Sequence, residues 1–382
     1  MKILSIVGAR PNFMKIAPFI KAINSYNSGD SQKIYHLLVH TGQHYDQNMS
    51  ASFFEDLGIP RPDINLGIGS GSHAQQVGNT MIELEKVMQK ERPDWVIVVG
   101  DVNATLAASV TAKKEQIKCA HIEAGLRSGD LKMPEEINRL VTDRLSDLLF
   151  TPDLHSNENL KKEGVPEEKI KFVGNIMIDT LETHRENALK LSVEQIIKSN
   201  VFPDSPHYFI PSTSFALLTM HRPSNVDDRD ILSQIIGFLC EDVALKMKLI
   251  WPIHPRTEGR LKEFNLWENL VDNENIILLK PIGYLEMLRL NMDADIMLTD
   301  SGGLQEECTV LGTPCITMRW NTERPITLQE NGGASVLVGN DVNQAREEFH
   351  RMLKEGRKPV RPELWDGKTA ERILKELINF SN

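Results

Sequence analysis

Short apolar segments alternate with amphipathic segments along the whole chain, and this rhythm constrains the fold more than any other feature. Residues 2–8 (KILSIVG) and 95–101 (WVIVVGD) are almost continuously apolar, as expected of parallel strands buried on both faces. Segments with helical periodicity follow them, at 11–26 and 103–116. Strands that alternate with helices at this spacing predict a parallel, doubly wound α/β sheet.

The rhythm is interrupted once, at residues 203–214 (PDSPHYFIPSTS), which have the composition of a linker or loop. Because 382 residues also exceed one core of usual size, we predict two Rossmann-like domains with a ligand cleft between them. A loop is predicted at 62–72. The other predicted strands are 33–42, 119–125, 148–151, 171–174, 215–220, 248–253, 276–279, 296–299, 315–318 and 335–338, and the other main helices 47–58, 72–92, 177–197, 342–356 and 369–380.

Composition and charge exclude several classes of protein. The chain has 43 Lys and Arg against 53 Asp and Glu, a formal charge of −10, which argues against nucleic acid or a membrane surface as partner. No apolar run approaches the roughly 18 residues of a membrane span, and no signal peptide is visible. The four cysteines form no CxxC motif and are predicted to be free thiols in a reducing cytoplasm.

The segment 121–136 (HIEAGLRSGDLKMPEE) gathers more chemistry-bearing groups than any other. It begins as a strand that carries Glu123 and ends at Pro134-Glu135, the predicted first turn of a helix. Asp101 similarly follows a buried strand, where it either serves a ligand, caps the next helix, or does both. Ligands of open α/β sheets bind at the carboxyl ends of strands. We therefore predict that this segment supplies acid–base groups acting on an anionic sugar nucleotide.

Two strand-to-helix turns are suited to phosphate. In residues 8–15 (GARPNFMK), Arg10 and Lys15 flank a predicted helix amino terminus, although a tight turn with solvated basic residues explains them equally well. In the turn Ser301-Gly302-Gly303, the glycines allow backbone N–H groups to approach a diphosphate, and Ser301 can cap the helix. Glu306 or Glu307 can then accept hydrogen bonds from a ribose. Arg324 either meets the remaining phosphate charge or is an ordinary surface arginine.

Three further signals are weaker. Residues 41–46 (TGQHYD) either line the cleft or form a polar loop, and His221 and His254 each follow a strand. A single histidine of this kind is more often structural than catalytic. Because GxGxxG, HExxH and any cluster of metal-ligating residues are missing from the sequence, we expect neither a nicotinamide or flavin cofactor nor a metal.

Taken together, these motifs resemble the non-hydrolysing UDP-N-acetylglucosamine 2-epimerases over nearly the whole length. The resemblance runs in register through GARPNFMK, TGQHYD, VVGD, HIEAGLRSGD, PEEINR, MHRPSN, PIHPRT, TDSGGLQEE and TERP. It implies the glycosyltransferase-B fold, with residues 1–175 and 365–382 facing 176–364 across a cleft. It also implies a homodimer, and a metal-free elimination and re-addition of UDP that inverts C2 of the sugar.

The resemblance assigns expected roles to particular side chains. Its catalytic carboxylates are Asp101, Glu123 and Glu135, with His221 as the partner on the phosphate side. The expected substrate-binding residues are Arg10, Lys15 and Arg324 for the diphosphate, Ser301, Gly302 and Gly303 wrapped around it, Glu307 for the ribose, and Ile282 and Met287 in the segment against the uracil.

The chain also departs from the family pattern. Asn12 stands where many members have an acidic residue, and the loop between Arg127 and Pro134 is two residues short of some bacterial members. Ile282 and Met287 replace an expected Gln and Phe. The run YDQNMS after GQH differs from the run linked with activation by a second substrate molecule, so we expect weak or no activation.

Four alternatives remain open at this stage. They are an epimerase of another UDP sugar such as a 2,3-diacetamido-glucuronic acid, a hydrolysing epimerase, a glycosyltransferase on the same fold, and a sugar-nucleotide sensor. The last two fit less well, because binding alone would not need three buried acids.

Overall fold

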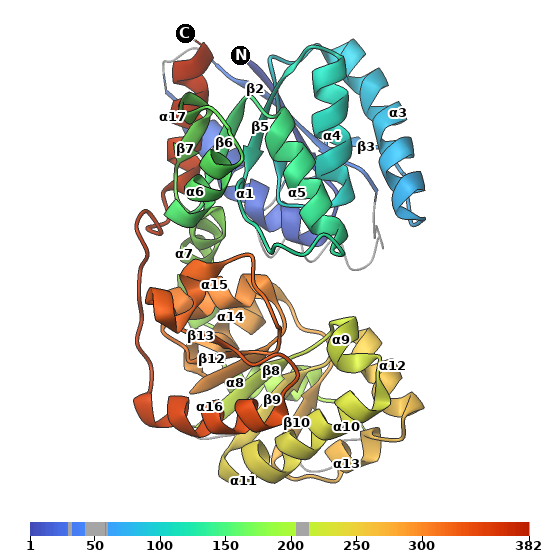
Figure 1. Ribbon diagram of the computed structural model, residues 1–382, viewed down its shortest axis with the longest axis vertical. Helices are drawn as coiled ribbons and strands as arrows, with labels where there is room; N and C mark the ends of the chain where they lie inside the picture. Colours follow the sequence, from blue (N-terminus) through green and yellow to red (C-terminus); the bar gives the residue numbers. More distant parts are fainter. Residues whose placement is uncertain (30–32, 43–57, 59, 204–213, 382) are drawn as a thin grey trace. The chain divides into compact units, whose positions relative to one another are not determined.

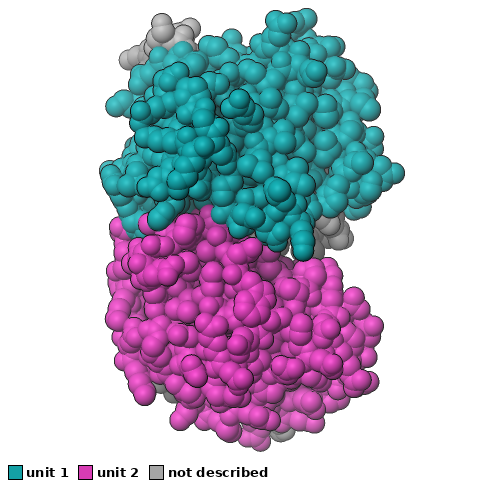
Figure 2. Space-filling view, viewed as in Figure 1, with its two compact units in different colours: residues 1–183, 362–382 teal, residues 184–361 magenta. Residues whose placement is uncertain are grey.

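The computed structural model describes residues 1–29, 33–42, 58, 60–203 and 214–381. The chain divides into two compact units, unit 1 at residues 1–183 and 362–382 and unit 2 at residues 184–361 (Figures 1 and 2). Residues 47–57 of the predicted helix 47–58 and most of the predicted linker 203–214 lie outside the described residues.

In the described part of unit 1, seven strands pair in parallel in the order β3-β2-β1-β4-β5-β6-β7. The strands are β1 (Lys2–Val7), β2 (Tyr35–His40), β3 (Ile64–Asn65), β4 (Trp95–Val99), β5 (Lys118–Ile122), β6 (Leu148–Thr151) and β7 (Ile170–Phe172). The helices are α1 (Arg10–Asn27), α3 (His73–Glu91), α4 (Asn103–Lys114), α5 (Pro134–Leu145), α6 (Leu154–Lys162), α7 (Ile176–Leu189) and α17 (Thr369–Ser381). The prediction of a loop over 62–72 is wrong at β3, whose two residues give no periodic signal.

In the described part of unit 2, six strands pair in parallel in the order β10-β9-β8-β11-β12-β13. The strands are β8 (Phe215–Thr219), β9 (Lys248–Pro252), β10 (Ile276–Leu279), β11 (Ile296–Thr299), β12 (Cys315–Thr317) and β13 (Ser335–Leu337). The helices are α8 (Val193–Asn200), α9 (Pro223–Val226), α10 (Arg229–Phe238), α11 (Ala244–Lys246), α12 (Pro255–Glu263), α13 (Trp267–Val271), α14 (Tyr284–Asp293), α15 (Gly302–Leu311) and α16 (Val342–Glu355).

Both sheets have the strand order of a Rossmann fold, in which the direction of winding reverses beside the first strand. The reversal falls between β1 and β4 in unit 1 and between β8 and β11 in unit 2. All residues of β4 and β11 are buried, as continuously apolar parallel strands should be. The loops after these strands therefore mark the two positions at which such folds hold ligands.

The first border between the two units lies within α7, which is followed by a separate helix, α8. The predicted single helix over 177–197 is two helices, because Ser192 caps α8 by accepting a hydrogen bond from the Gln195 N–H. The helix before it, α7, begins at Ile176 in unit 1 and ends beyond the border at Thr183. The expected borders at 175/176 and 364/365 thus lie close to those at 183/184 and 361/362.

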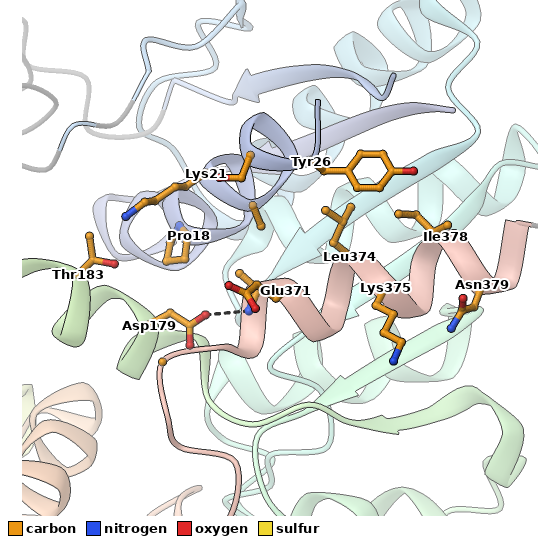
Figure 3. A pocket seen from close by; sticks show the side chains of 14 residues that line it. Pro18, Lys21, Tyr26, Asp179, Thr183, Glu371, Leu374, Lys375, Ile378 and Asn379 are labelled. Atoms are coloured by element: carbon orange, nitrogen blue, oxygen red, sulfur yellow. Dashed lines mark hydrogen bonds between the residues drawn. The ribbon is translucent and has the colours of Figure 1, made fainter. Parts of the chain in front are cut away.

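The last helix completes unit 1. Helix α17 packs against α1, and the carboxylate of Asp179 caps its amino terminus, accepting from the N–H groups of Thr369 (3.0 Å) and Ala370 (2.7 Å) (Figure 3). Just before α17, the indole N–H of Trp365 donates to the carbonyl oxygen of Pro152 (2.9 Å). A pocket of about 460 Å³ lies beside these helices. The chain's last segment is therefore an integral part of the first unit.

The structure also bears on two expectations drawn from the sequence, the state of the cysteines and the presence of membrane-spanning helices. The four cysteines are free, with Cys119, Cys308 and Cys315 buried and Cys240 half-buried. Among the described residues, every helix is too short or too polar to cross a membrane.

Candidate active site

A buried ion pair lies at the switch point of unit 1. Lys15, in the second turn of α1, pairs through Nζ with Oε2 of Glu123, which follows β5. Residue Glu123 is only 5% exposed and Lys15 only 8%. Charges are costly to bury unless paired, and this contact offsets part of that cost for both groups. The predicted diphosphate ligand Lys15 and the predicted carboxylate Glu123 are thus brought together.

Glu123 also has an unusual backbone. Its φ of +74° lies in the left-handed region, which side chains with a Cβ rarely adopt. The conformation is held by the N–H groups of Glu123 and Ala124, which both donate to the carbonyl oxygen of Phe150 (3.1 and 3.0 Å). A non-glycine residue in this region costs about 1–3 kcal/mol and is typical of functional sites.

Gly100 makes room for this pair. It has a φ of +67°, and a Cβ at this position would lie 3.3 Å from Lys15 Nζ and from Asn12 Nδ2, and 3.4 Å from Glu123 Oε2. Asn12 accepts hydrogen bonds from the N–H groups of Gly8 (3.2 Å) and Ala9 (3.0 Å), and donates to Val99 (3.0 Å). The amide side chain at position 12, where an acidic residue was expected, therefore ties the loop after β1 to β4.

Asp101 belongs to a second cluster of charges. It is half-buried and pairs with Arg139 Nη1, while Arg139 Nη2 contacts Glu136 Oε2 (2.7 Å). Glu136 also accepts from the N–H groups of Ser128 (3.0 Å) and Gly129 (2.9 Å). Burial by itself would raise the pKa of Glu136, but these donors and Arg139 hold that pKa below its ordinary value. The cap of α4 is Val102, so the alternative reading of Asp101 as a helix cap is wrong.

His121 and its partner Asp143 contact the loop after β4 and the loop after β5. It is fully buried, with Nδ1 2.6 Å from Asp143 Oδ1 and Nε2 2.8 Å from the carbonyl oxygen of Gly100. Both ring nitrogens therefore lie within hydrogen-bond distance of an oxygen atom. Asp143 also accepts from the Gly125 N–H (3.0 Å) and pairs with Arg127 (2.7 Å). The pair of His121 and Asp143 therefore fixes the turns at Gly100 and Gly125, which adjoin the predicted carboxylates.

The other residues predicted for the site in unit 1 are either more exposed than expected or outside the described part of the chain. Glu135 lies in the first turn of α5 and is exposed, and Asp101 is half-buried, so the expectation of three buried acids is wrong for two of them. Arg10 begins α1, but its side chain is outside the described part of the chain, as are residues 43–46 of the predicted TGQHYD segment. The region on which the activation hypothesis rests lies there too.

In unit 2, His221 follows β8 and is held by Asp300, which follows β11. His221 Nδ1 lies 3.1 Å from Asp300 Oδ1, and Asp300 Oδ2 accepts from the N–H groups of His221 (2.9 Å) and Arg222 (2.8 Å). Burial alone would raise the pKa of Asp300, but the hydrogen bonds and charge of His221 hold it below its ordinary value. The ring of His254 lies 5.3 Å from that of His221. His221 is therefore oriented by a buried carboxylate.

The predicted phosphate turn has the expected backbone. Ser301 precedes the ten residues of α15, but its side chain makes no capping hydrogen bond, contrary to the prediction. A Cβ on Gly302 would lie 2.8 Å from Arg324 Nη1, whereas Gly303 faces open space. The first N–H groups of a helix lack intrahelical partners and attract anions. A side chain at position 302 would thus displace the end of Arg324, whereas one at position 303 would meet no neighbour within 4 Å.

Arg324 is part of a buried chain of charges. Its Nε lies 2.8 Å from Glu306 Oε1 and its Nη1 contacts Glu323 Oε1, while Glu323 Oε2 lies 2.7 Å from Arg319 Nη2. Burial opposes the charge on Glu323, yet the two guanidinium groups hold its pKa below its ordinary range. Arg319, Glu323 and Arg324 are each at most 6% exposed. The structure thus places Arg324 at the amino terminus of α15.

The predicted ribose and uracil residues lie around α14 and α15. Glu307 is buried, and burial raises its pKa to about 7, with the carboxylate of Glu306 adding to the rise and Tyr284 opposing it. Ile282 and Met287 are half-buried and pack against the apolar cluster around β10. Ile282 and Met287 thus belong to the apolar side of β10, and the carboxyl group of Glu307 is buried on α15.

Sequence reasoning missed the partners of the predicted residues, namely Gly100, Arg139, Asp143, Asp300 and Arg319. Only the motif VVGD hints at Gly100. No group of three His, Cys, Asp or Glu suited to a metal ion occurs within the described residues.

A model of the UDP-N-acetylglucosamine 2-epimerase family matches residues 28–378. The chain is 44% identical over 379 residues to the UDP-N-acetylglucosamine 2-epimerase of Methanocaldococcus jannaschii, covering 99% of each. It is 41% identical over 343 residues to the UDP-2,3-diacetamido-2,3-dideoxy-D-glucuronate 2-epimerase of Pseudomonas aeruginosa, covering 89% of this chain and 88% of that one. The M. jannaschii enzyme, solved in complex with UDP-GlcNAc and UDP, matches with a TM-score of 0.86 and 42% identity over 99% of this chain and 100% of that chain.

Two parallel Rossmann-type sheets, with charged residues at the carboxyl ends of their central strands, define a two-domain α/β protein of the glycosyltransferase-B type. The chain belongs to the UDP-N-acetylglucosamine 2-epimerase family, and it is an isomerase. The resemblance inferred from its motifs is thereby confirmed.

Proposed function

We propose that this protein catalyses the reversible C2 epimerisation of UDP-N-acetylglucosamine to UDP-N-acetylmannosamine. The observation that carries the proposal is the buried, strained Glu123 paired with Lys15 at the switch point of unit 1. It is supported by the 42% identical M. jannaschii enzyme, which was crystallised with UDP-GlcNAc and UDP. A carboxylate held at such cost is suited to proton transfer and to a neighbouring positive charge.

The proposed reaction has two halves. In the first, the C1–O bond breaks and its electron pair leaves with UDP, while a base removes the C2 proton and the C2–H electron pair forms the C1=C2 double bond. The product is a bound 2-acetamidoglucal. In the second, UDP adds back at C1 and a proton arrives at C2 from the opposite face.

Because the C2 proton has no adjacent carbonyl, C1–O cleavage runs ahead of proton loss and C1 gains positive charge. The carboxylates Asp101, Glu123 and Glu135 are the groups proposed to stabilise this charge and to transfer the proton. We assign Glu123 and Glu135 to opposite faces of the sugar. Wild-type exchange of the C2 proton in both Glu123→Gln and Glu135→Gln would refute this assignment.

The remaining predicted residues are proposed to bind UDP. Arg10, Lys15, Arg324 and His221 stabilise the leaving diphosphate together with the amino terminus of α15. His221 is suited to this role because Asp300 holds its Nδ1 and so fixes the ring orientation. Glu307 accepts from the ribose, and the uracil lies against Ile282 and Met287. Assembly as a homodimer also stays a proposal, which light scattering during size-exclusion chromatography tests.

The decisive experiment is proton NMR of the protein with UDP-N-acetylglucosamine in deuterated buffer. Loss of the C2 proton signal and a new anomeric signal of UDP-N-acetylmannosamine are expected. Free N-acetylmannosamine with UDP would instead indicate the hydrolysing reaction. An unchanged spectrum would refute the proposed substrate.

A second substrate is favoured by a specific observation, namely 41% identity to the P. aeruginosa enzyme named for UDP-2,3-diacetamido-2,3-dideoxy-D-glucuronate. That sugar nucleotide carries an additional carboxylate. The same NMR experiment with both compounds, compared by kcat/KM, decides between them.

A further inference from the structure

Two guanidinium groups and one carboxylate meet at the first residue of α15. A Cβ built on Gly302 would lie 2.8 Å from Arg324 Nη1, 2.9 Å from Glu323 Oε1 and 3.4 Å from Arg319 Nη1. The three side chains come from the loop after β12, and each is at most 6% exposed. They are therefore packed around the helix end that the proposed function assigns to the diphosphate.

The carboxylate of Glu323 is shared between the two arginines. Its Oε2 accepts from Arg319 Nη2 (2.7 Å), and its Oε1 accepts from Arg324 Nη1. The second nitrogen of the Arg319 fork, Nη1, is buried and has no hydrogen-bond partner among the described residues. A buried donor without an acceptor is costly, so natural proteins seldom keep one without a reason.

The same arrangement creates a difficulty for Arg324. If Arg324 turned to a ligand phosphate, it would leave Oε1 of Glu323 buried, charged and unpaired, which opposes binding. Arg319 offers the remedy, because the two nitrogens of a guanidinium fork match the two oxygens of a carboxylate. Arg319 Nη1 and Glu323 Oε1 both lie near the position of a Cβ built on Gly302, at 3.4 Å and 2.9 Å from it.

We propose that Arg319 is a positioning residue that releases Arg324 to the diphosphate. When Arg324 Nη1 turns from Glu323 to the ligand, Arg319 Nη1 takes over Glu323 Oε1, and Glu323 ends in a bidentate pair with Arg319. No covalent bond changes, and one hydrogen bond is exchanged for another. The inference rests on the proposed function, since it takes the diphosphate of a UDP sugar as the ligand of Arg324.

The test is a double-mutant cycle on the affinity for UDP, measured by isothermal titration calorimetry on the full chain. The variants are Arg319→Gln, Arg324→Gln and their combination, with uridine as a ligand that lacks phosphate. We expect Arg319→Gln to weaken UDP binding about 10-fold or more and to change uridine binding less than about 2-fold. In the Arg324→Gln background, Arg319→Gln should have almost no further effect.

Two control variants separate the proposed effect from a general loss of positive charge and from misfolding. Arg346→Gln removes a charge of the same sign from the pair of Arg346 with Asp242 on unit 2, and it should leave UDP affinity unchanged. Arg319→Lys keeps the charge but not the fork, so it should still weaken UDP binding, and it replaces Arg319→Gln if that variant does not fold.

Several results would overturn the inference. They are unchanged UDP affinity in Arg319→Gln, an equal loss for uridine and UDP, or a full additional loss in the Arg324→Gln background. The last result would mean that Arg319 acts without Arg324. Failure of the proposed function would appear instead in the wild-type reaction with UDP-N-acetylglucosamine, which these affinities do not involve.

Discussion

At the scale of single residues, Gly100 has the most exacting position in unit 1. Its positive φ makes any larger side chain unfavourable by about 1–2 kcal/mol. Its neighbours are the ends of Asn12, Lys15 and Glu123, which an added methyl group would displace by a few tenths of an ångström. Position 100 therefore couples backbone geometry to the placement of the proposed catalytic pair.

We predict that Gly100→Ala lowers kcat by about 10-fold or more, because small displacements of reacting groups are costly. Gly164→Ala is the matched control, since Gly164 has a φ of +77° but a Cβ there meets nothing within 4 Å. Both variants should lose similar thermal stability, and only Gly100→Ala should lose activity. Equal activities in steady-state kinetics would contradict the argument.

Glu307 predicts a pH dependence of stability. Its pKa is raised to about 7 in the folded protein, above the ordinary 4.5 of an unfolded chain. The folded state then binds more protons between these values, so its stability is fully present below pH 4.5 and falls as pH rises through 7. The loss amounts to about 3 kcal/mol at most.

Glu307→Gln should abolish this decline, because its amide does not titrate. Urea unfolding of both proteins from pH 5 to pH 8 measures the difference. Glu258→Gln on α12, which removes a carboxylate paired with Lys262, serves as the control and should follow the wild type. Parallel curves for wild type and Glu307→Gln would show that Glu307 titrates normally.

At the scale of elements, α17 depends on a cap supplied from a distant part of the chain. Asp179 binds two N–H groups of α17 across 190 residues. We predict that Asp179→Ala weakens the start of α17 by about 1–2 kcal/mol, raising hydrogen exchange of its amides about 10-fold. Asp341→Ala removes a comparable but local cap and should affect α16 alone. Unchanged exchange in α17 would show that packing against α1 suffices.

Elements that bury both faces could be predicted from the sequence, because parallel strands such as β4 read as continuous apolar runs. The two-residue β3 could not, since it is too short to show a pattern. Among site residues, Glu123 was recognisable as a lone carboxylate after a buried strand. Its partner Lys15 was assigned to phosphate instead, because a contact across 108 residues leaves no local signal. Arg139, three residues after Glu136, reads as an ordinary pair on a helix surface.

At the scale of the whole molecule, the proposed ligand contacts are divided between the units. The groups assigned to uracil and ribose lie in unit 2, and those assigned to the sugar and part of the diphosphate lie in unit 1. We predict that uridine slows hydrogen exchange only in unit 2, whereas UDP slows it in both units, notably at residues 100–103 and 301–304. If UDP slowed hydrogen exchange in one unit only, the assignment of UDP-binding groups to both units would be refuted.

Unit 1 consists of two stretches of chain, because the polypeptide leaves it at Thr183 and returns at Pro362. On a ribosome, its first stretch emerges before unit 2 but waits for α17, which follows the whole of unit 2 in the chain. At about 5–20 residues per second, the wait is on the order of ten seconds or more. Until then, the face of α1 that packs against α17 has no cover on the nascent chain. Unit 1 is thus completed only after the whole of unit 2 has been made, and chaperones can bind the uncovered face of α1 during that interval.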